Sequence, residues 1–194
     1  MMHAQADIDA PYRQDLRHIG VCSVDPPGCK DIDDALHART LPNGNLELGV
    51  HIADVSHFVH PGSAMDEEAA RRCTTVYLVQ RRIDMLPKPL TEDICSLRGG
   101  VERLAFSVMW EMTPELECVR TTFTKSVIRS AAAMTYGEAQ TRIDDPALKD
   151  ELTESLRTML RVSKVLKLRR YDYVCMHDYV CMHVSMYLNT AVLP

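Results

Sequence analysis

The stretch DPPGCKDIDD at residues 25–34 places four carboxylates within ten residues. It follows HIGVCSV at residues 18–24, which has the composition of a strand. The sequence Pro26-Pro27-Gly28 predicts a sharp turn after that strand, so that Asp25 faces the three later aspartates. This acidic loop is therefore the first candidate for a functional site.

Asp31, Asp33 and Asp34 make the acidic loop a candidate metal site. In an extended chain Asp31 and Asp33 share one face, whereas Asp34 points elsewhere unless the chain turns. Carboxylates buried together repel one another strongly unless cations lie between them. Mg²⁺ prefers oxygen ligands, and phosphate oxygens can complete its shell. Two such ions can activate water and stabilise the leaving oxygen in phosphodiester hydrolysis.

A solvated acidic turn is the competing interpretation, and the spacing alone leaves both open. A calcium loop of the EF-hand type fits poorly, because counting from Asp31 puts Leu36 where glycine is needed and Pro42 where glutamate is needed. An aspartyl nucleophile of the phosphatase kind has no partner motif to support it. On the residues alone, an unrelated Mg²⁺ or Ca²⁺ binder also stays open.

Composition excludes several classes of function. The chain has 194 residues, 46% of them hydrophobic and 25% charged, as expected for one soluble globular domain. We expect no membrane span and no signal peptide, because the apolar runs are short and the first residues, MMHAQADIDA, are polar. The net charge of −5 argues against a broad nucleic-acid-coating surface but not against nucleic acid as a substrate. Seven irregularly spaced cysteines indicate a reducing intracellular compartment.

Turn signals predict two β-hairpins in the first two thirds of the chain. Asn43-Gly44 is a typical hairpin turn, and residues 113–115 supply a second one. The strands that they join are residues 35–41 with 46–52, and 104–112 with 116–126.

Two short helices are also predicted. The segment 65–72 is acid-rich near its start, which suits the positive end of the helix dipole. Thr135 and Glu138 have the spacing of a capping box, which starts a helix near Tyr136.

The longest predicted helix begins at Asp145-Pro146 and ends near Arg170. Aspartate supplies the N-cap and proline the first helical position. Because the strands come first and the helices after them, the sequence predicts the α+β class.

Residues 1–17 and 171–194 differ from the rest of the chain. The first stretch has no periodicity, and we expect a ragged start. The hexapeptide DYVCMH at 172–177 is repeated unchanged at 178–183, which is more typical of a duplicated nucleotide tract than of a folded repeat. The odd-numbered positions of the repeat include Cys175, His177, Cys181 and His183, which an extended chain would place on one face like a set of metal ligands. The duplication accounts for this pattern without a metal.

The acidic loop and the segments around it resemble the RNB domain of the ribonuclease II superfamily. VDPPGCKDIDDALH at residues 24–37 is similar to the catalytic signature of that family. The similarity runs from about residue 16 to about residue 170 and is to the eukaryotic branch that serves the RNA exosome. Further matching segments are LELGVHIADVSHFVHPGSAMDEEAARR (46–72), TTVYL (74–78), RIDMLP (82–87), ICSLR (94–98), RLAFSVMWEM (103–112), FTKSVI (123–128) and MTYGEAQTRID (134–144).

The resemblance implies the N-terminal portion of an RNB-type catalytic domain over residues 18–170, with a mixed sheet and flanking helices. The family's metal-holding aspartates correspond to Asp25, Asp31, Asp33 and Asp34, which implies Mg²⁺ at the end of a channel for single-stranded RNA. The implied activity is that of a 3′-5′ exoribonuclease, which hydrolyses RNA to nucleoside 5′-monophosphates by Mg²⁺-assisted attack of water. The implied role is RNA processing and decay, with the RNA exosome core as a partner and the nucleus, nucleolus and cytoplasm as locations.

Tyr77 and Tyr136 match family tyrosines that pack near the terminal nucleotides of the RNA. Stacking of a base on an aromatic ring tolerates any sequence and contributes about 1–3 kcal/mol per base. The alternative is that both rings belong to the core. His51, Asp54 and His57 are spaced like metal ligands, but the family uses that segment as scaffold behind the site, so they are not part of the predicted metal set.

The chain departs from the family in two ways. Cys73 stands where the family commonly has glycine, and a positive φ at that position would strain a cysteine. The later half of the family's domain, with an arginine that clamps the scissile phosphate, has no counterpart here. We therefore expect a metal site with weak or no activity in isolation, and the alternative function is a truncated RNB remnant with at most weak RNA binding.

Overall fold

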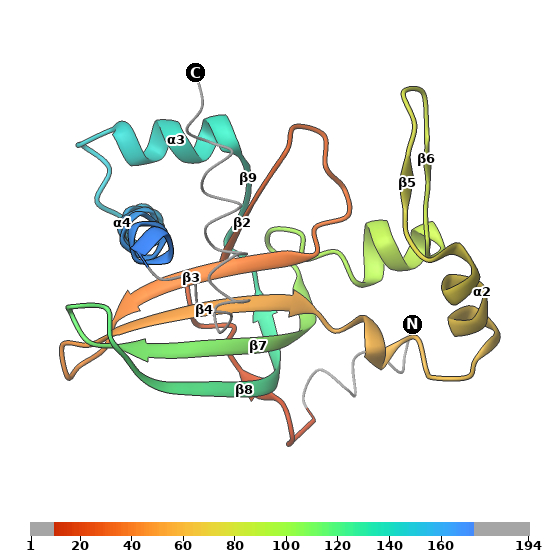
Figure 1. Ribbon diagram of the computed structural model, residues 1–194, viewed down its shortest axis with the longest axis horizontal. Coiled ribbons are helices and arrows are strands. Elements are labelled where there is room, and N and C mark those ends of the chain that lie inside the picture. Colours follow the sequence, from red (N-terminus) through yellow and green to blue (C-terminus); the bar gives the residue numbers. More distant parts are fainter. Residues whose placement is uncertain (1–9, 173–194) are drawn as a thin grey trace.

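The computed structural model describes residues 10–172, which form a seven-stranded mixed sheet, a separate two-stranded hairpin and flanking helices (Figure 1). The α+β class predicted from the sequence is confirmed. The order across the large sheet is β1-β8-β7-β4-β3-β2-β9, in which the outer pairs β1/β8 and β2/β9 are parallel. Its strands are β1 (Gln14–Asp15), β2 (Cys22–Asp25), β3 (Asp34–Thr40), β4 (Leu46–Ala53), β7 (Glu102–Met112), β8 (Cys118–Arg129) and β9 (Ala132–Thr135).

Both predicted hairpins are confirmed and form the centre of the large sheet. β3 pairs antiparallel with β4 around a turn in which Gly44 has a φ of +86°, a value that favours glycine. β7 pairs antiparallel with β8, and β4 joins the two hairpins by pairing with β7. The start of β3 is thereby fixed in the middle of a sheet, directly after the acidic loop.

Two helices cover one face of this sheet. The predicted capping box is present at the start of α3 (Tyr136–Asp144), where Thr135 and Glu138 bond each other's backbone N–H. α4 (Glu151–Asp172) lies over β3 (Figure 1). The apolar core between this helix and the sheet contains Leu36, Leu48 and Val50 from the strands with Leu156, Met159 and Val162 from the helix.

A second apolar cluster packs on other sheet residues, among them Val21, Ala35 and Ile128. Two short helical segments belong to this part of the chain, η1 (Val55–His57) and η2 (Pro89–Ile94). The smaller hairpin of β5 (Val76–Tyr77) and β6 (Arg82–Ile83) lies with α2 (Ala64–Arg72) at the opposite end of the molecule from α3 and α4 (Figure 1). The helix predicted over 65–72 is thus confirmed as α2.

The helices within residues 10–172 include none long and apolar enough to cross a bilayer.

The strand predicted over 18–24 is shorter in the structure and begins at Cys22. Upstream of it the backbone N–H of Ile19 donates to Leu16 and that of Val21 donates to Ile19, so this stretch forms local turns instead of a ladder. The longer prediction is therefore wrong at its first residues.

The predicted start of the longest helix is also wrong. Asp150 accepts hydrogen bonds from the backbone N–H and the hydroxyl of Thr153, so Asp150 performs the capping, and α4 begins at Glu151. Asp145 instead ends α3 and accepts from the backbone N–H of Ala147. Both aspartates have the chemistry of a cap, and only the later one lies where α4 packs on the sheet.

Residues 13–16 have more structure than the ragged start expected from the sequence. β1 pairs with β8, and the backbone N–H of Leu16 donates to Val127. The buried Arg13 guanidinium contacts the Asp54 carboxylate at 2.8 Å and the ring of His57 at 3.3 Å. Asp54 and His57 are thus scaffold groups that hold the start of the chain, as the family resemblance implied.

His51 is likewise part of a buried polar ladder that crosses four strands. Its ring contacts His37 at 2.8 Å and Ser107 at 2.7 Å, and Ser107 contacts Ser126 at 2.6 Å. All four side chains are buried, and each satisfies its neighbour's hydrogen-bonding capacity. The repeated hexapeptide beyond residue 172, with its cysteines and histidines, lies outside the described residues.

Candidate functional site

The acidic loop connects β2 to β3 and is held by hydrogen bonds from a distant segment. Gly28 has a φ of +81°, as the Pro-Pro-Gly turn requires. The Ser96 hydroxyl accepts from the backbone N–H of Ile32 at 3.2 Å and donates to the carbonyl of Lys30 at 2.7 Å. Ser96 therefore fixes the backbone of the loop on both sides of Asp31.

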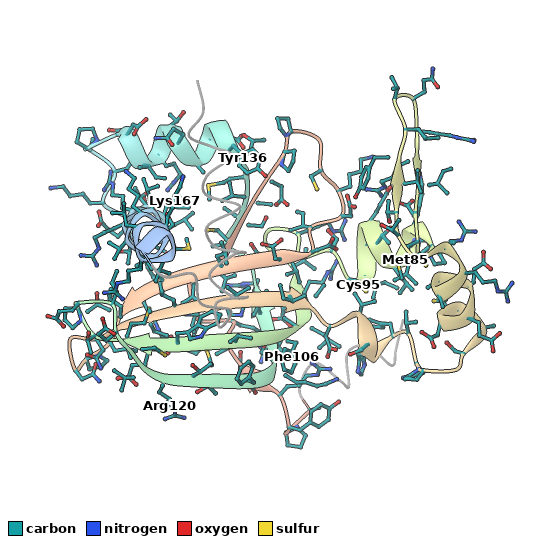
Figure 2. All side chains as sticks on the ribbon, viewed as in Figure 1. Met85, Cys95, Phe106, Arg120, Tyr136 and Lys167 are labelled. Atoms are coloured by element: carbon teal, nitrogen blue, oxygen red, sulfur yellow. The ribbon has the colours of Figure 1, made fainter. Side chains whose placement is uncertain are left out.

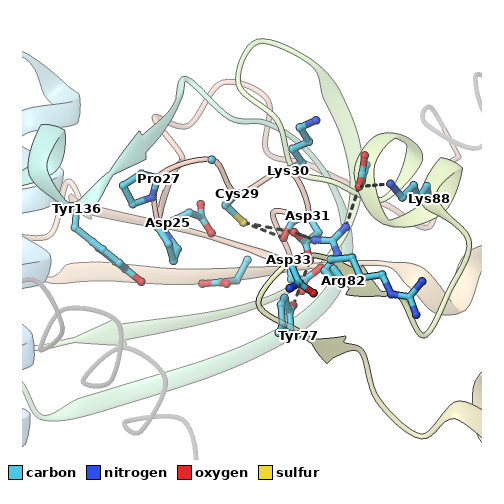
Figure 3. A pocket seen from close by; sticks show the side chains of 16 residues that line it. Asp25, Pro27, Cys29, Lys30, Asp31, Asp33, Tyr77, Arg82, Lys88 and Tyr136 are labelled. Carbon is cyan, nitrogen blue, oxygen red and sulfur yellow. Dashed lines mark hydrogen bonds and ion pairs between the residues drawn. The ribbon is translucent and has the colours of Figure 1, made fainter.

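One cavity of about 880 Å³ contains all six side chains predicted from the sequence (Figure 3). Figure 3 shows Tyr136 and Asp25 on one side of this cavity, with Tyr77 and Arg82 on the other. The predicted residues that line it are Asp25, Asp31, Asp33, Asp34, Tyr77 and Tyr136.

The electrostatics of the cavity oppose the ionised form of two carboxyl groups. Burial raises the pKa of Asp25, and the nearby Asp31 raises it further. Burial also raises the pKa of Asp33, again with contributions from Asp31 and Asp25. The buried Oδ2 atom of Asp25 has no hydrogen-bond partner among the described residues. The site therefore has negative charge and an unpaired acceptor that a cation or a donor would satisfy.

Asp31 differs from the other aspartates because side chains of the smaller hairpin already engage both of its oxygens. Its Oδ1 atom forms an ion pair with Arg82, and its Oδ2 atom lies 3.5 Å from the hydroxyl of Tyr77. The Cys29 thiol, whose pKa burial raises to about 12, lies 3.6 Å from the same Oδ1 atom. Asp31 thus joins the acidic loop to β5 and β6.

Arg82 is a charged residue of this cavity that the sequence did not predict. Its guanidinium forms ion pairs with Asp31, Asp84 and Glu92, and it lines the same cavity. RIDMLP was noted only as part of a matching segment, and nothing in its spacing connects its arginine with an aspartate of the acidic loop. Charge pairing between distant segments has no periodic signal in a sequence.

The two tyrosines occupy different environments. The side chain of Tyr77 is 72% exposed, which argues against the core alternative for this ring. Tyr136 is half-buried at the first position of α3 and reaches the cavity from the capping box. One ring is thus fixed by a helix start, and the other stands on a hairpin.

The donor set fits a divalent cation that keeps part of its water shell. Within residues 10–172 no three His, Cys, Asp or Glu side chains converge tightly enough to enclose a metal ion. Mg²⁺ is usually bound through one or two carboxylates together with waters and substrate phosphates, and it needs no closed protein cage. The orphaned Asp25 oxygen and the mutual repulsion of these carboxylates suit that mode of binding.

Cys73, the departure from the family pattern, has a φ of 63° and a ψ of −39°. The backbone N–H of Thr74 donates to the carbonyl of Arg72 at 2.7 Å across it, which makes a tight γ-type turn. The conformation expected from the family's glycine is therefore present, and a non-glycine residue occupies it under strain.

Comparison with curated proteins gives high similarity over most of the chain. It is 66% identical over 166 residues to the Exosome complex exonuclease RRP44 homolog A of Arabidopsis thaliana, an alignment that covers 86% of this chain and 18% of that protein. It is 59% identical over 164 residues to the Exosome complex exonuclease RRP44 of Homo sapiens, and this alignment covers 84% of this chain and 17% of that protein. The chain therefore spans less than a fifth of the length of these relatives.

Comparison with solved structures supports the same fold. The structure of Mycoplasma genitalium RNase R in complex with ribose methylated single-stranded RNA has a TM-score of 0.77 at 26% identity, and the match covers 87% of this chain and 28% of that one. The structure of yeast Ssd1, a pseudonuclease, has a TM-score of 0.74 at 23% identity, and the match covers 86% of this chain and 20% of that one. At this identity the match shows a shared fold and nothing more. The RNB domain family model matches residues 13–178, which is most of the chain. On this evidence the chain belongs to the RNB domain family of ribonucleases.

Proposed function

We propose that this chain carries the cation-binding and RNA-end-binding part of a 3′-5′ exoribonuclease that acts on single-stranded RNA in RNA processing and decay. The observation that carries the proposal is the single cavity in which four aspartates and two tyrosines meet, although they come from three separated segments. The names of the relatives, which are exosome exonucleases, support the same assignment.

In this proposal the four aspartates hold Mg²⁺, which when bound supplies an activated water and offsets charge on the scissile phosphate. Asp25 and Asp33 contribute buried negative charge, so they draw a cation to the inner part of the cavity. The exposed ring of Tyr77 offers a stacking surface to a terminal base, and Tyr136 lines the other side. The expected products are nucleoside 5′-monophosphates.

The partners and the location belong to the same proposal. Single-stranded RNA is the substrate, and we propose the RNA exosome core as the assembly that the chain serves, because the relatives are exosome components by name. The nucleus, nucleolus and cytoplasm are the expected places of action.

A catalytically weak or inactive RNB remnant is the second candidate function. It is favoured by the shared fold of a pseudonuclease, since the fold alone does not decide activity. Such a chain would bind RNA weakly without shortening it.

The two candidates are separated by incubating the full chain with 5′-labelled single-stranded RNA and Mg²⁺. Asp33→Asn removes one charge from the site, and Asp144→Asn on the exposed face of α3 makes the same change elsewhere. The exoribonuclease proposal expects progressive shortening from the 3′ end that EDTA abolishes. Asp33→Asn should slow it about 10²–10³-fold, which is the usual loss for one preorganised electrostatic contact. Asp144→Asn should retain the wild-type rate.

Other outcomes assign the chain differently. RNA left intact by a protein with a cooperative unfolding transition, together with weak binding of the label, would support the remnant. Mg²⁺ binding that Asp33→Asn weakens, with no RNA binding in either protein, would instead indicate an unrelated cation binder.

A further inference from the structure

The hairpin of β5 and β6 is attached to the cavity in an unusual way. It has little apolar burial, because Val76, Leu78 and Val79 are 43%, 48% and 101% exposed. It belongs to its own two-stranded sheet and does not extend the seven-stranded one. The position of Tyr77 beside Asp31 therefore depends on polar contacts.

Arg82 supplies most of those contacts. Tyr77 and Arg82 are directly paired across the hairpin, so their side chains lie on the same face of it. The guanidinium reaches Asp31 in the acidic loop, Asp84 at the end of the hairpin, and Glu92 in η2, the last at 3.0 Å. A planar guanidinium with five N–H donors can serve three carboxylates at once, which a lysine ammonium cannot do with the same geometry.

Other contacts anchor the base of the hairpin but not its tip. The backbone N–H of Met85 donates to the Thr75 hydroxyl at 3.1 Å, and Arg72 donates to the carbonyl of Asp84 at 3.2 Å. Between these anchors and the tip, two side chains cross to the acidic loop: Arg82 through its ion pair with Asp31, and Tyr77 through a hydroxyl contact of 3.5 Å with the same carboxylate. Its own side chain is 20% exposed, so water screens these ion pairs only in part.

We infer that Arg82 is a positioning residue that ties the Tyr77 hairpin to Asp31 and thereby couples the cation site to the surface on which the RNA end stacks. The inference rests on the proposed function for the roles of the cation and the RNA, but the tie itself is a property of the fold. Because Arg82 neutralises Asp31, it also competes with a cation for that carboxylate. Loss of Arg82 should therefore have opposite effects on the two ligands.

The test uses the full-length chain with Arg82→Met, and Arg81→Met as the matched control. Arg81 carries the same charge, lines the same cavity and makes none of the three ion pairs of Arg82. Hydrogen exchange measured by mass spectrometry should become at least about tenfold faster at residues 77–82 in Arg82→Met, because local opening of a weakly packed segment sets the exchange rate there. Exchange in β3, β4, β7 and β8 should be unchanged in both variants.

Two binding measurements complete the experiment. Titration with Mg²⁺ alone should show about thirtyfold tighter binding in Arg82→Met, the effect of removing one unit charge about 4 Å from a doubly charged ion in water-like surroundings. Anisotropy of 5′-labelled single-stranded RNA, measured with Asp33→Asn in every protein so that the RNA is not consumed, should show about tenfold weaker binding, from the loss of one ordered stacking surface. A purely structural defect would weaken both ligands together.

Each result bears on one claim. Unchanged exchange at residues 77–82 in Arg82→Met would overturn the inference, as would accelerated exchange throughout the large sheet, because Arg82 would then support the whole fold. Faster exchange at the hairpin with weaker Mg²⁺ binding would overturn the coupling. If no variant binds or shortens RNA, the proposed function fails, while the exchange and Mg²⁺ results still decide whether Arg82 ties the hairpin.

Discussion

The seven-stranded sheet and the hairpin of β5 and β6 border the same cavity but are stabilised by different interactions. The sheet has side chains packed on both of its faces (Figure 2), where it is buried between two apolar clusters. It also contains the polar ladder of His37 and His51. The hairpin exposes most of its large apolar side chains and depends on the ion pairs of Arg82. Hydrophobic burial is insensitive to moderate salt, whereas partly exposed ion pairs are weakened by it.

The two regions contribute different residues to the candidate site. Asp25, Asp33 and Asp34 lie at or next to strand ends of the large sheet, which fixes the spacing of their carboxylates. Tyr77 stands on a segment with little apolar burial, for which a low free energy of local opening is expected, and under the proposed function this suits a surface that accepts successive nucleotides. Under the proposed function, a rigid cation-binding half and an adjustable base-stacking half therefore meet at Asp31.

The rigidity of the sheet can be tested most severely at Gly49. A Cβ atom at this position would lie 2.2 Å from Cε1 and 2.4 Å from Nδ1 of His37, so Gly49→Ala forces the histidine ladder apart. We expect a loss of about 3 kcal/mol in the free energy of unfolding, the upper part of the usual range for overpacking. Urea denaturation followed by the fluorescence of Trp110 measures it.

Gly137→Ala is the matched control, because nothing lies within 4 Å of the corresponding Cβ position in α3. Alanine in place of a helical glycine should leave stability unchanged or raise it slightly. If Gly49→Ala were as stable as Gly137→Ala, the ladder would not constrain the sheet and the contrast with the hairpin would be lost.

The next largest effect is the pH dependence that His51 gives to the sheet. Burial lowers the pKa of His51 from 6.5 to about 3, with a further contribution from His37. The unfolded chain therefore binds a proton that the folded chain excludes. This stability is fully present above pH 6.5 and is lost progressively as the pH falls toward 3. Between pH 7 and pH 5 the loss should be about 2 kcal/mol.

His51→Gln should flatten that part of the stability profile, measured by urea denaturation at pH 7, 6 and 5. Glu47, whose pKa the hydrogen bond from His37 lowers to about 2, loses its stabilisation as the pH falls through and below 4.5, so it contributes little above pH 5. Equal slopes in the wild type and in His51→Gln would show that His51 does not titrate as a buried neutral ring.

Patterns that act over a few residues predicted the central strands of the large sheet, whereas no such pattern predicted the hairpin of β5 and β6. Asn43-Gly44 and the pair of Thr135 and Glu138 act over a few residues, and both were found where expected. The start of α4 was misplaced because two aspartates have cap chemistry and packing selects between them. The parallel pairing of β2 with β9 joins distant segments without a local pattern.

In the candidate site, too, residues within a local motif were predicted, and pairings between distant segments were not. The four aspartates and two tyrosines were predicted from a compact motif and a family resemblance, and the cavity brings them together. Arg82 and Arg13 were missed because an arginine that pairs with a distant carboxylate looks like any other surface charge in a sequence. Only the fold shows which charges are partners.

The smallest expected effect lies on the hairpin side, at Cys73. This residue ends α2 in a γ-type turn with a positive φ, a conformation that costs a non-glycine residue about 1–2 kcal/mol. Cys73→Gly removes that strain, but glycine also gains freedom in the unfolded chain, which offsets about 0.5–1 kcal/mol. We expect a net gain of about 0.5 kcal/mol in urea denaturation, and Cys73→Ala, which removes the thiol but keeps a Cβ atom, should show none.

The same gain should appear in local hydrogen exchange. Relief of strain at Cys73 lowers the free energy of the folded state, so it raises the free energy of every opening in which this turn comes apart, whether local or global. Exchange should therefore slow about twofold at the last turn of α2 and at residues 74–76. Amides of β7 and β8 that exchange only through global unfolding should slow by the same factor, whereas those that exchange through openings within the sheet should not change. Unchanged exchange at residues 74–76 would mean that the turn at Cys73 stores no strain.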